Sequence, residues 1–138
     1  MIKGFTCGAM DLLHAGHVLM LKECRGKCDY LIVGLQSDPS GTSTEYRGKK
    51  KNKPIETLEE RRVRLEGCRY VDEIKVYDTE EDLYKLLEEL KPDVRFLGAD
   101  WKDKKYTGYD LPIKIIFNSR DHKYSSSNLR ERIKNSDI

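Results

Sequence analysis

Apolar residues in this chain gather into five short runs that are rich in Val, Ile, Leu and Phe. The runs cover residues 2–7, 30–35, 73–77, 94–97 and 113–117. Several of them are continuous rather than alternating, which is typical of parallel strands that are covered on both faces of a sheet. The pattern therefore predicts five buried strands.

Segments with helical spacing lie between and after these runs, at residues 17–25, 57–67, 79–90 and 126–135. The second segment begins with a capping box, Thr57 with Glu60 three residues later, and ends at Gly67. The third opens on acidic residues and carries a leucine stripe that ends at Leu90, with Pro92 just beyond. We expect that stripe to pack in the core.

Strands and helices alternate along the chain with short links. This order predicts one domain over residues 1–138: a single doubly wound, Rossmann-like parallel α/β sheet of five strands with helices on both faces. Ligands of such sheets bind in the crevice at the carboxyl ends of the strands. The loops that leave those ends cover residues 8–16, 36–56, 98–112 and 118–125.

Charge and composition narrow the function. Lys and Arg number 26 against 24 Asp and Glu, a net charge of +2, and this balance argues against a nucleic-acid or membrane-surface partner. No stretch approaches the roughly 18 apolar residues of a membrane span. The chain starts directly in a strand-like segment, so we expect no signal peptide and a cytoplasmic location. The cysteines, Cys7, Cys24, Cys28 and Cys68, are expected to be reduced core thiols.

The first loop holds the residues best suited to chemistry. Gly8 follows the first strand and lets backbone approach a ligand closely. His14 and His17 flank Gly16 where a helix begins. A helix N-terminus offers unpaired N–H groups and a partial positive charge, which suits a phosphate, and imidazoles there can donate further hydrogen bonds.

The last loop has the same character. Three consecutive serines begin the final helix, so one can cap it while the others face an anion. Arg120 adds a fork-shaped donor that suits phosphate. Two helix N-termini would then converge on one triphosphate.

These motifs together resemble a known family. Gly8-Ala9-Met10-Asp11 followed by His14-Ala15-Gly16-His17 is similar to the G-x-x-D and H-x-G-H signature of the cytidylyltransferase-like nucleotidyltransferases, in particular the small bacterial glycerol-3-phosphate cytidylyltransferases. Gly98-Ala99-Asp100-Trp101 resembles the family's G-D-D-W loop. Residues 120–127 stand where the family has R-T-E-G-I-S-T-T, with His122 and Lys123 in place of its Glu and Gly.

The resemblance implies a role for each matching residue. The implied catalytic residues are His14, His17, Arg120 and lysines of the basic loop, where Lys50 is a further candidate beside Lys51 and Lys53. The implied nucleotide ligands are Gly8, Ala9, Met10, Asp11, Gly16, Asp100, Tyr124, Ser125, Ser126 and Ser127. The implied acceptor ligands are Arg61, Arg69 and Trp101.

The resemblance also implies an activity, which is transfer of CMP from CTP to a small phosphorylated alcohol. Glycerol 3-phosphate is the expected acceptor, giving CDP-glycerol and pyrophosphate, with Mg²⁺ on the triphosphate and a homodimer as the assembly. Asp11 could orient a metal-bound water; no other protein ligand for the metal is expected. Two alternatives stay open: an ATP-dependent adenylyltransferase of sugar phosphates, whose H-A-G-H matches residues 14–17 equally well, and a nucleotide-binding regulatory module without turnover.

Overall fold

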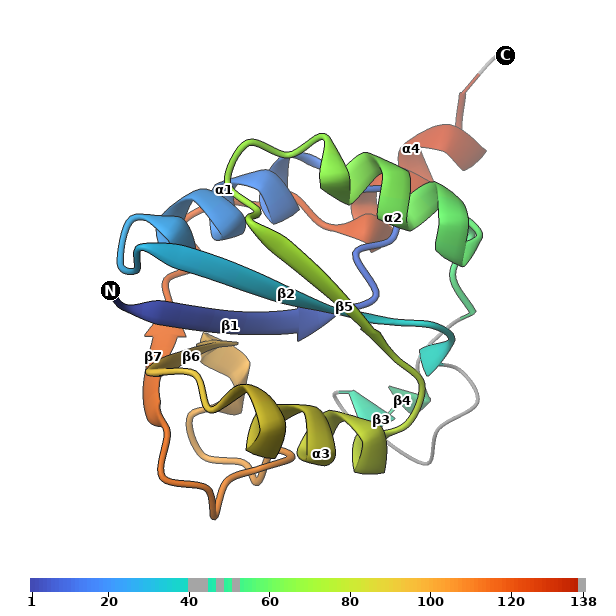
Figure 1. Cartoon of the computed structure of the whole chain (residues 1–138). Helices are drawn as coiled ribbons and strands as arrows, with labels where there is room; N and C mark the ends of the chain where they lie inside the picture. The colour runs from blue at the N-terminus through green and yellow to red at the C-terminus, as the bar shows by residue number, and fades with distance from the viewer. Residues whose placement is uncertain (40–44, 47–48, 51–52, 137–138) are drawn as a thin grey trace.

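The computed structural model describes residues 1–39, 45–46, 49–50 and 53–136. Its centre is a parallel sheet in the order β5-β2-β1-β6-β7 (Figure 1). The strands are β1 (Lys3–Gly8), β2 (Tyr30–Gln36), β5 (Glu73–Tyr77), β6 (Val94–Gly98) and β7 (Lys114–Asn118). The prediction of a single doubly wound, five-stranded parallel sheet is confirmed. Each predicted strand is present, and the bounds agree to within one residue at either end.

Four α-helices surround the sheet: α1 (Ala15–Arg25), α2 (Leu58–Glu66), α3 (Glu80–Leu90) and α4 (Ser126–Lys134). Figure 1 shows α1 and α2 over one face and α3 over the other, as predicted. A short 3₁₀ helix, η2 (Ala99–Trp101), follows β6. The hairpin of β3 (Glu45–Tyr46) and β4 (Lys49–Lys50) was not predicted. In the basic loop, residues 47–53, Lys51 and its neighbours Arg47, Gly48 and Asn52 lie outside the described residues.

Two apolar layers hold these helices on the sheet. On one face, Leu21 and Cys24 of α1 and Leu65 of α2 pack with the inward side chains of the central strands. On the other face, Leu83 and Leu87 of α3 pack on a second set. Strands covered on both sides must be apolar on both sides, which explains their continuous runs. The leucine stripe is core packing, as expected.

The helix starts follow from local chemistry. The Thr57 hydroxyl accepts from the backbone N–H of Glu60 at 3.1 Å, and the Glu60 carboxylate accepts from the N–H of Thr57 at 3.0 Å. Thr79 and Asp82 form the same reciprocal pair at the start of α3. Each pair satisfies two backbone donors that the helix itself leaves unbonded.

The four cysteines are free thiols, and Cys24 and Cys28 are buried. Within the described residues, no group of three or more His, Cys, Asp or Glu side chains could hold a metal ion. No helix in the described part of the chain is both long enough and apolar enough to cross a membrane.

Candidate active site

A cleft of about 970 Å³ opens at the carboxyl ends of the strands. That volume lies near the upper end of the range for ligand pockets, roughly 300–1,000 Å³. Several of the predicted site residues line it: Gly8, Ala9, Met10, Asp11, His17, Trp101, Ser126 and Ser127. The topology that was predicted for the sheet therefore brings the first and last loops to one place.

The two histidines of the first loop cap α1 together. The backbone N–H of Gly16 donates to Nδ1 of His14 at 3.0 Å, and the N–H of His14 donates to Nδ1 of His17 at 3.2 Å. The rings stack with centroids 4.0 Å apart. This is a capping box in which imidazoles take the places of Thr and Glu.

These hydrogen bonds fix the form of each ring. An Nδ1 that accepts a hydrogen bond carries no proton, so the neutral imidazole holds its proton on Nε2. Burial lowers the pKa of His17 to about 4, with a further contribution from His14. Burial also lowers the pKa of His14, and His122 and Arg120 add to that shift. Both rings are therefore neutral Nε2–H donors at pH 7.

The third histidine of the chain lies against the same pair. A Cβ placed on Gly16 would lie 2.8 Å from Cε1 of His122 and 2.9 Å from Cε1 of His14. The rings of His14 and His122 therefore both pack against Gly16, where a larger side chain would collide with them. Nδ1 of His122 accepts from the N–H of Tyr124 at 3.1 Å. The sequence marked His122 only as a departure from the family pattern, and the structure makes it a neighbour of the site.

Asp11 organises the loops around the cleft. Its carboxylate accepts from the backbone N–H groups of Ile55 and Glu56 at 2.9 and 3.0 Å, and from Nη2 of Arg130 at 3.0 Å. Burial alone would raise the pKa of this carboxyl, but the two amides and the guanidinium outweigh it and hold the pKa low. Both oxygens are engaged, so this carboxylate joins α4 to the segment before α2. That Asp11 orients a metal-bound water stays a prediction.

The serines at the start of α4 divide their roles. The Ser125 hydroxyl accepts from the N–H of Asn128 at 3.0 Å and caps the helix, whereas Ser126 and Ser127 line the cleft. Arg130 lies on the same helical face and also lines the cleft. Its buried Nε has no partner within the described part of the chain. Sequence reasoning missed Arg130, although its spacing from Ser126 and Ser127 places it beside them.

Other predicted residues lie beside the cleft and are not among the residues that line it. Arg120 faces Asp100 across 4.0 Å, and both side chains are partly exposed. Arg120 also acts on the pKa of His14, so its charge lies near the imidazoles. Tyr124 is half exposed and stacks on His122, with the ring centroids 5.5 Å apart.

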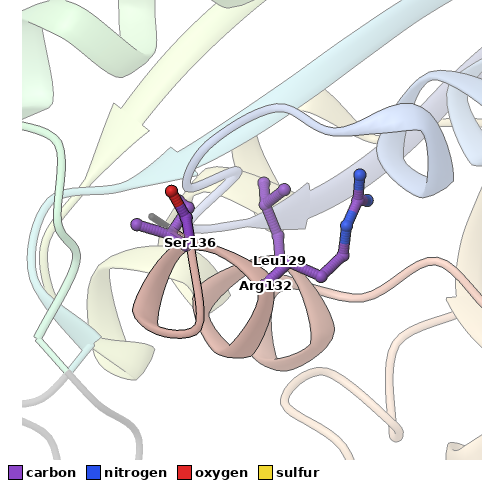
Figure 2. Close-up of a pocket in the computed structure, with 4 residues that line it drawn as sticks. Leu129, Arg132 and Ser136 are labelled. Carbon is purple, nitrogen blue, oxygen red and sulfur yellow. The ribbon is translucent and has the colours of Figure 1, made fainter. Parts of the chain in front are cut away.

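A second hollow, about 430 Å³, lies on α4 itself. Figure 2 shows three of its lining residues: Leu129 and Arg132 on that helix, and Ser136 just after its end. Helical spacing places them on a different side of α4 from Ser126 and Arg130. The hollow contains none of the residues that cap α1, so the candidate chemistry belongs to the first cleft.

The family model described as Cytidylyltransferase-like matches residues 5–132. The chain belongs to the cytidylyltransferase-like family. It is 42% identical over 114 residues to the bifunctional protein HldE of Wolinella succinogenes, a match that covers 81% of this chain and 23% of that protein. It is 35% identical over 130 residues to HldE of Campylobacter jejuni, covering 94% and 27%. The chain thus spans about a quarter of the length of these curated relatives.

Two solved structures share the fold of this chain. A lipopolysaccharide core biosynthesis protein from Thermoplasma volcanium superposes with a TM-score of 0.68 at 28% identity, over 88% of this chain and 99% of that one. Pantothenate synthetase from Thermus thermophilus superposes with a TM-score of 0.61 at 16% identity, over 97% and 64%, a likeness of fold alone.

These relatives correct the predicted substrates. The curated relatives described above, which match 81–94% of this chain, are bifunctional HldE proteins. The prediction of CMP transfer from CTP to glycerol 3-phosphate is therefore wrong. The alternative of an ATP-dependent adenylyltransferase of sugar phosphates stays open within the cytidylyltransferase-like family.

The structure also argues against the expected role of Arg61 as a ligand of the acceptor. This residue is buried, and its guanidinium donates to the backbone carbonyls of Glu56 at 3.2 Å, Ala9 at 3.0 Å and Gln36 at 2.6 Å, as well as to that of Ser37. It ties the loop after β1 to the end of β2. Four of its five N–H donors bond to backbone carbonyls of the chain, so we assign Arg61 as a positioning residue rather than a ligand of the acceptor.

Arg69 lies at the wrong end of the sheet to bind substrate. It is exposed, its guanidinium carbon lies 5.7 Å from the ring centroid of Tyr70, and it precedes β5 by a few residues. The start of a parallel strand lies at the amino edge, opposite the cleft. Of the lysines predicted to be catalytic, Lys53 is exposed just before Pro54, which lines the cleft, and Lys51 lies outside the described residues.

Proposed function

We propose that this domain transfers AMP from ATP to the phosphate of a sugar phosphate and releases pyrophosphate. The observation that carries the proposal is the pair of neutral imidazoles at the start of α1, each held by its Nδ1 with Nε2–H left to donate. The H-A-G-H sequence resembles that of sugar-phosphate adenylyltransferases. One structural relative at 28% identity is a lipopolysaccharide core biosynthesis protein, which agrees with a sugar phosphate as the acceptor.

The triphosphate is expected between the N-termini of α1 and α4. Each terminus presents backbone N–H groups and a partial positive charge. Ser126 and Ser127 add hydroxyl donors from α4, and the unpartnered Nε of Arg130 adds a charged one. The imidazoles then face the α-phosphoryl group from α1, with Arg120 near the mouth.

The reaction needs no protein nucleophile, because the acceptor's phosphate is already anionic near neutral pH. One of its oxygens attacks the α-phosphorus of ATP in line. The bond from that phosphorus to the oxygen bridging the β-phosphorus breaks, and the electron pair leaves with pyrophosphate. His14 and His17 donate to the oxygens on which charge develops, so catalysis is positioning and electrostatic stabilisation.

Mg²⁺ is expected to arrive with the ATP. Protein sites for Mg²⁺ commonly combine one or two carboxylates with substrate phosphates and retained waters. The cleft's Asp11 has both oxygens in hydrogen bonds, and the described residues hold no cluster of metal ligands. The described side chains therefore offer no site of their own for the metal, and each step above uses the protein's donors alone.

A pyrophosphate-release screen tests the proposal. ATP and CTP are each offered with hexose 1-phosphates and with glycerol 3-phosphate, and we expect turnover with ATP and a sugar phosphate. His17→Asn keeps an acceptor near the Nδ1 position but removes Nε2–H, and should lower kcat by about 10²–10³-fold. Arg69→Gln is the matched control and should change nothing. Equal kcat in His17→Asn and wild type would contradict the assignment.

A further inference from the structure

Arg95 is a buried cation that has no role in the proposed adenylyl transfer. It belongs to β6, is 3% exposed, and lines the cleft. Its Nε has no hydrogen-bond partner among the residues that the structure describes. A buried donor without a partner costs free energy, so native proteins rarely leave one in place without a reason. An occupant of the cleft that accepts from Nε–H would remove that cost.

Specific contacts hold Arg95 and its neighbours in place. Its Nη1 donates to the carbonyl of Thr107, and its guanidinium carbon lies 5.3 Å from the ring centroid of Tyr106. The Thr107 hydroxyl donates to Glu80 at 2.9 Å. Gly108 follows with a φ of 85°, a conformation that favours glycine, and a Cβ at this position would lie 3.3 Å from Nη1 of Arg95. We call Tyr77, Glu80, Arg95, Tyr106 and Thr107 the Arg95 pocket.

The Arg95 pocket lies away from the imidazoles but in the same cleft. Arg95 pairs with Phe5 of β1, and its side chain shares with Phe5 the face that α3 covers. Phe5 precedes the last residue of β1 by three positions, about 10 Å of strand. His17 lies at the start of α1, on the other face. A ligand that reaches both must therefore extend from the reacting phosphorus down the α3 face.

The charge of the pocket selects a neutral ligand group. Burial and Cys7 raise the pKa of the Tyr77 hydroxyl, Glu80 adds to that shift, and Arg95 opposes it. Glu80 and Arg95 therefore both act on one phenol, and their charges offset each other. An anionic ligand group in this pocket would be repelled by the carboxylate of Glu80 as well as attracted by the guanidinium of Arg95. Hydroxyl groups accept from Arg95 and donate to Glu80, and the rings of Tyr77 and Tyr106 can cover the carbon face of a sugar.

We propose that the Arg95 pocket binds the hydroxyl groups of the acceptor's sugar, with Arg95 as the residue that sets acceptor specificity. The proposal rests on the proposed function, since it places the acceptor's phosphate at the imidazoles. A three-carbon acceptor such as glycerol 3-phosphate offers fewer hydroxyls to this pocket than a hexose phosphate does. Arg95 thereby favours the larger polyol.

Steady-state kinetics of Arg95→Met test the pocket. Loss of a charged donor to a hydroxyl should raise KM for a hexose 1-phosphate by about 10–100-fold. KM for ATP should stay within about twofold of wild type, because ATP does not depend on Nε–H of Arg95. Arg69→Gln serves as the control. Thr107→Val keeps the side-chain volume and removes the hydroxyl that donates to Glu80. It should also raise KM for the hexose 1-phosphate, and it replaces Arg95→Met if that variant fails to fold.

The outcomes separate this proposal from the function itself. An unchanged KM for the hexose 1-phosphate in Arg95→Met and Thr107→Val would overturn the pocket while leaving adenylyl transfer intact. A rise in KM for ATP instead would assign the pocket to the nucleotide and overturn the proposal. If wild type turns over no sugar phosphate, saturation-transfer NMR with a hexose 1-phosphate decides: signal from the sugar protons that Arg95→Met abolishes supports the pocket, and signal that persists overturns it.

Discussion

Gly16→Ala is the substitution that most directly tests how the imidazoles are held. The added Cβ would lie 2.8 Å from Cε1 of His122 and 2.9 Å from Cε1 of His14. The rings must withdraw by about 0.6 and 0.5 Å to reach 3.4 Å, the lower edge of ordinary contact. That movement strains the 3.0 Å hydrogen bond from the N–H of Gly16 to His14.

The size of the effect follows from those distances. A misplacement of 1 Å at a reacting centre can cost about 10²-fold in rate, so a shift near 0.6 Å should lower kcat by about 10–20-fold. Overpacking costs about 1–3 kcal/mol, and Ala in place of Gly within a helix returns about 0.5–1 kcal/mol. The free energy of unfolding should therefore fall by only about 1–2 kcal/mol.

Pyrophosphate release under saturating ATP and sugar phosphate measures kcat, and urea unfolding measures stability. Gly26→Ala is the control on the same helix: its Cβ would lie 3.4 Å from the carbonyls of Glu23 and Lys22, and its backbone is already helical at φ −69°. That variant should keep wild-type kcat. If Gly16→Ala also turns over within twofold of wild type, the close packing of the imidazoles has no catalytic role.

Further predictions concern the groups that the cleft holds in place. Long-range ¹⁵N NMR at pH 7 should show His17 as the neutral Nε2–H form, protonating only near pH 4; an Nδ1–H ring would refute the capping geometry. Arg61→Gln should lower the free energy of unfolding by about 3 kcal/mol, because buried carbonyls lose their donor, whereas Arg69→Gln should not. The low pKa of Asp11 contributes stability above its unfolded value of 3.8, a contribution lost as pH falls through the folded pKa. Asp11→Asn should therefore flatten the acid limb of the stability curve. Burial raises the pKa of the Cys24 thiol to about 12, so this thiol should react with a disulfide reagent only after unfolding.

Much of the fold could be predicted because its signals are local. Continuous apolar runs identify strands that are covered on both faces, and the capping pair of Thr57 and Glu60 fixes the start of α2. His14 and His17 could be assigned to a helix start for the same reason, since their contacts span only three residues. The hairpin of β3 and β4 has two-residue strands, too short for an apolar pattern.

Contacts between distant segments were not predictable in this way. Arg61 bonds to carbonyls of Ala9 and Gln36, which become its neighbours only when β1 and β2 pair. Arg95 lies inside a strand and looks like an interruption of an apolar run. Arg69 is different, because the topology rule already places a residue before a parallel strand at the amino edge. The role of Arg69 as an acceptor ligand came from the family resemblance and conflicts with this rule.

The central claim is that an oxygen of the sugar phosphate attacks the α-phosphorus of ATP in this cleft. Single-turnover ³¹P NMR with a hexose 1-phosphate whose non-bridging phosphate oxygens are ¹⁸O tests it most directly. With this mechanism all of the label should appear in the ADP-sugar and none in pyrophosphate, and CTP under the same conditions should give at least about tenfold less product. Label in pyrophosphate, release of AMP without ADP-sugar, or faster turnover with CTP would contradict it.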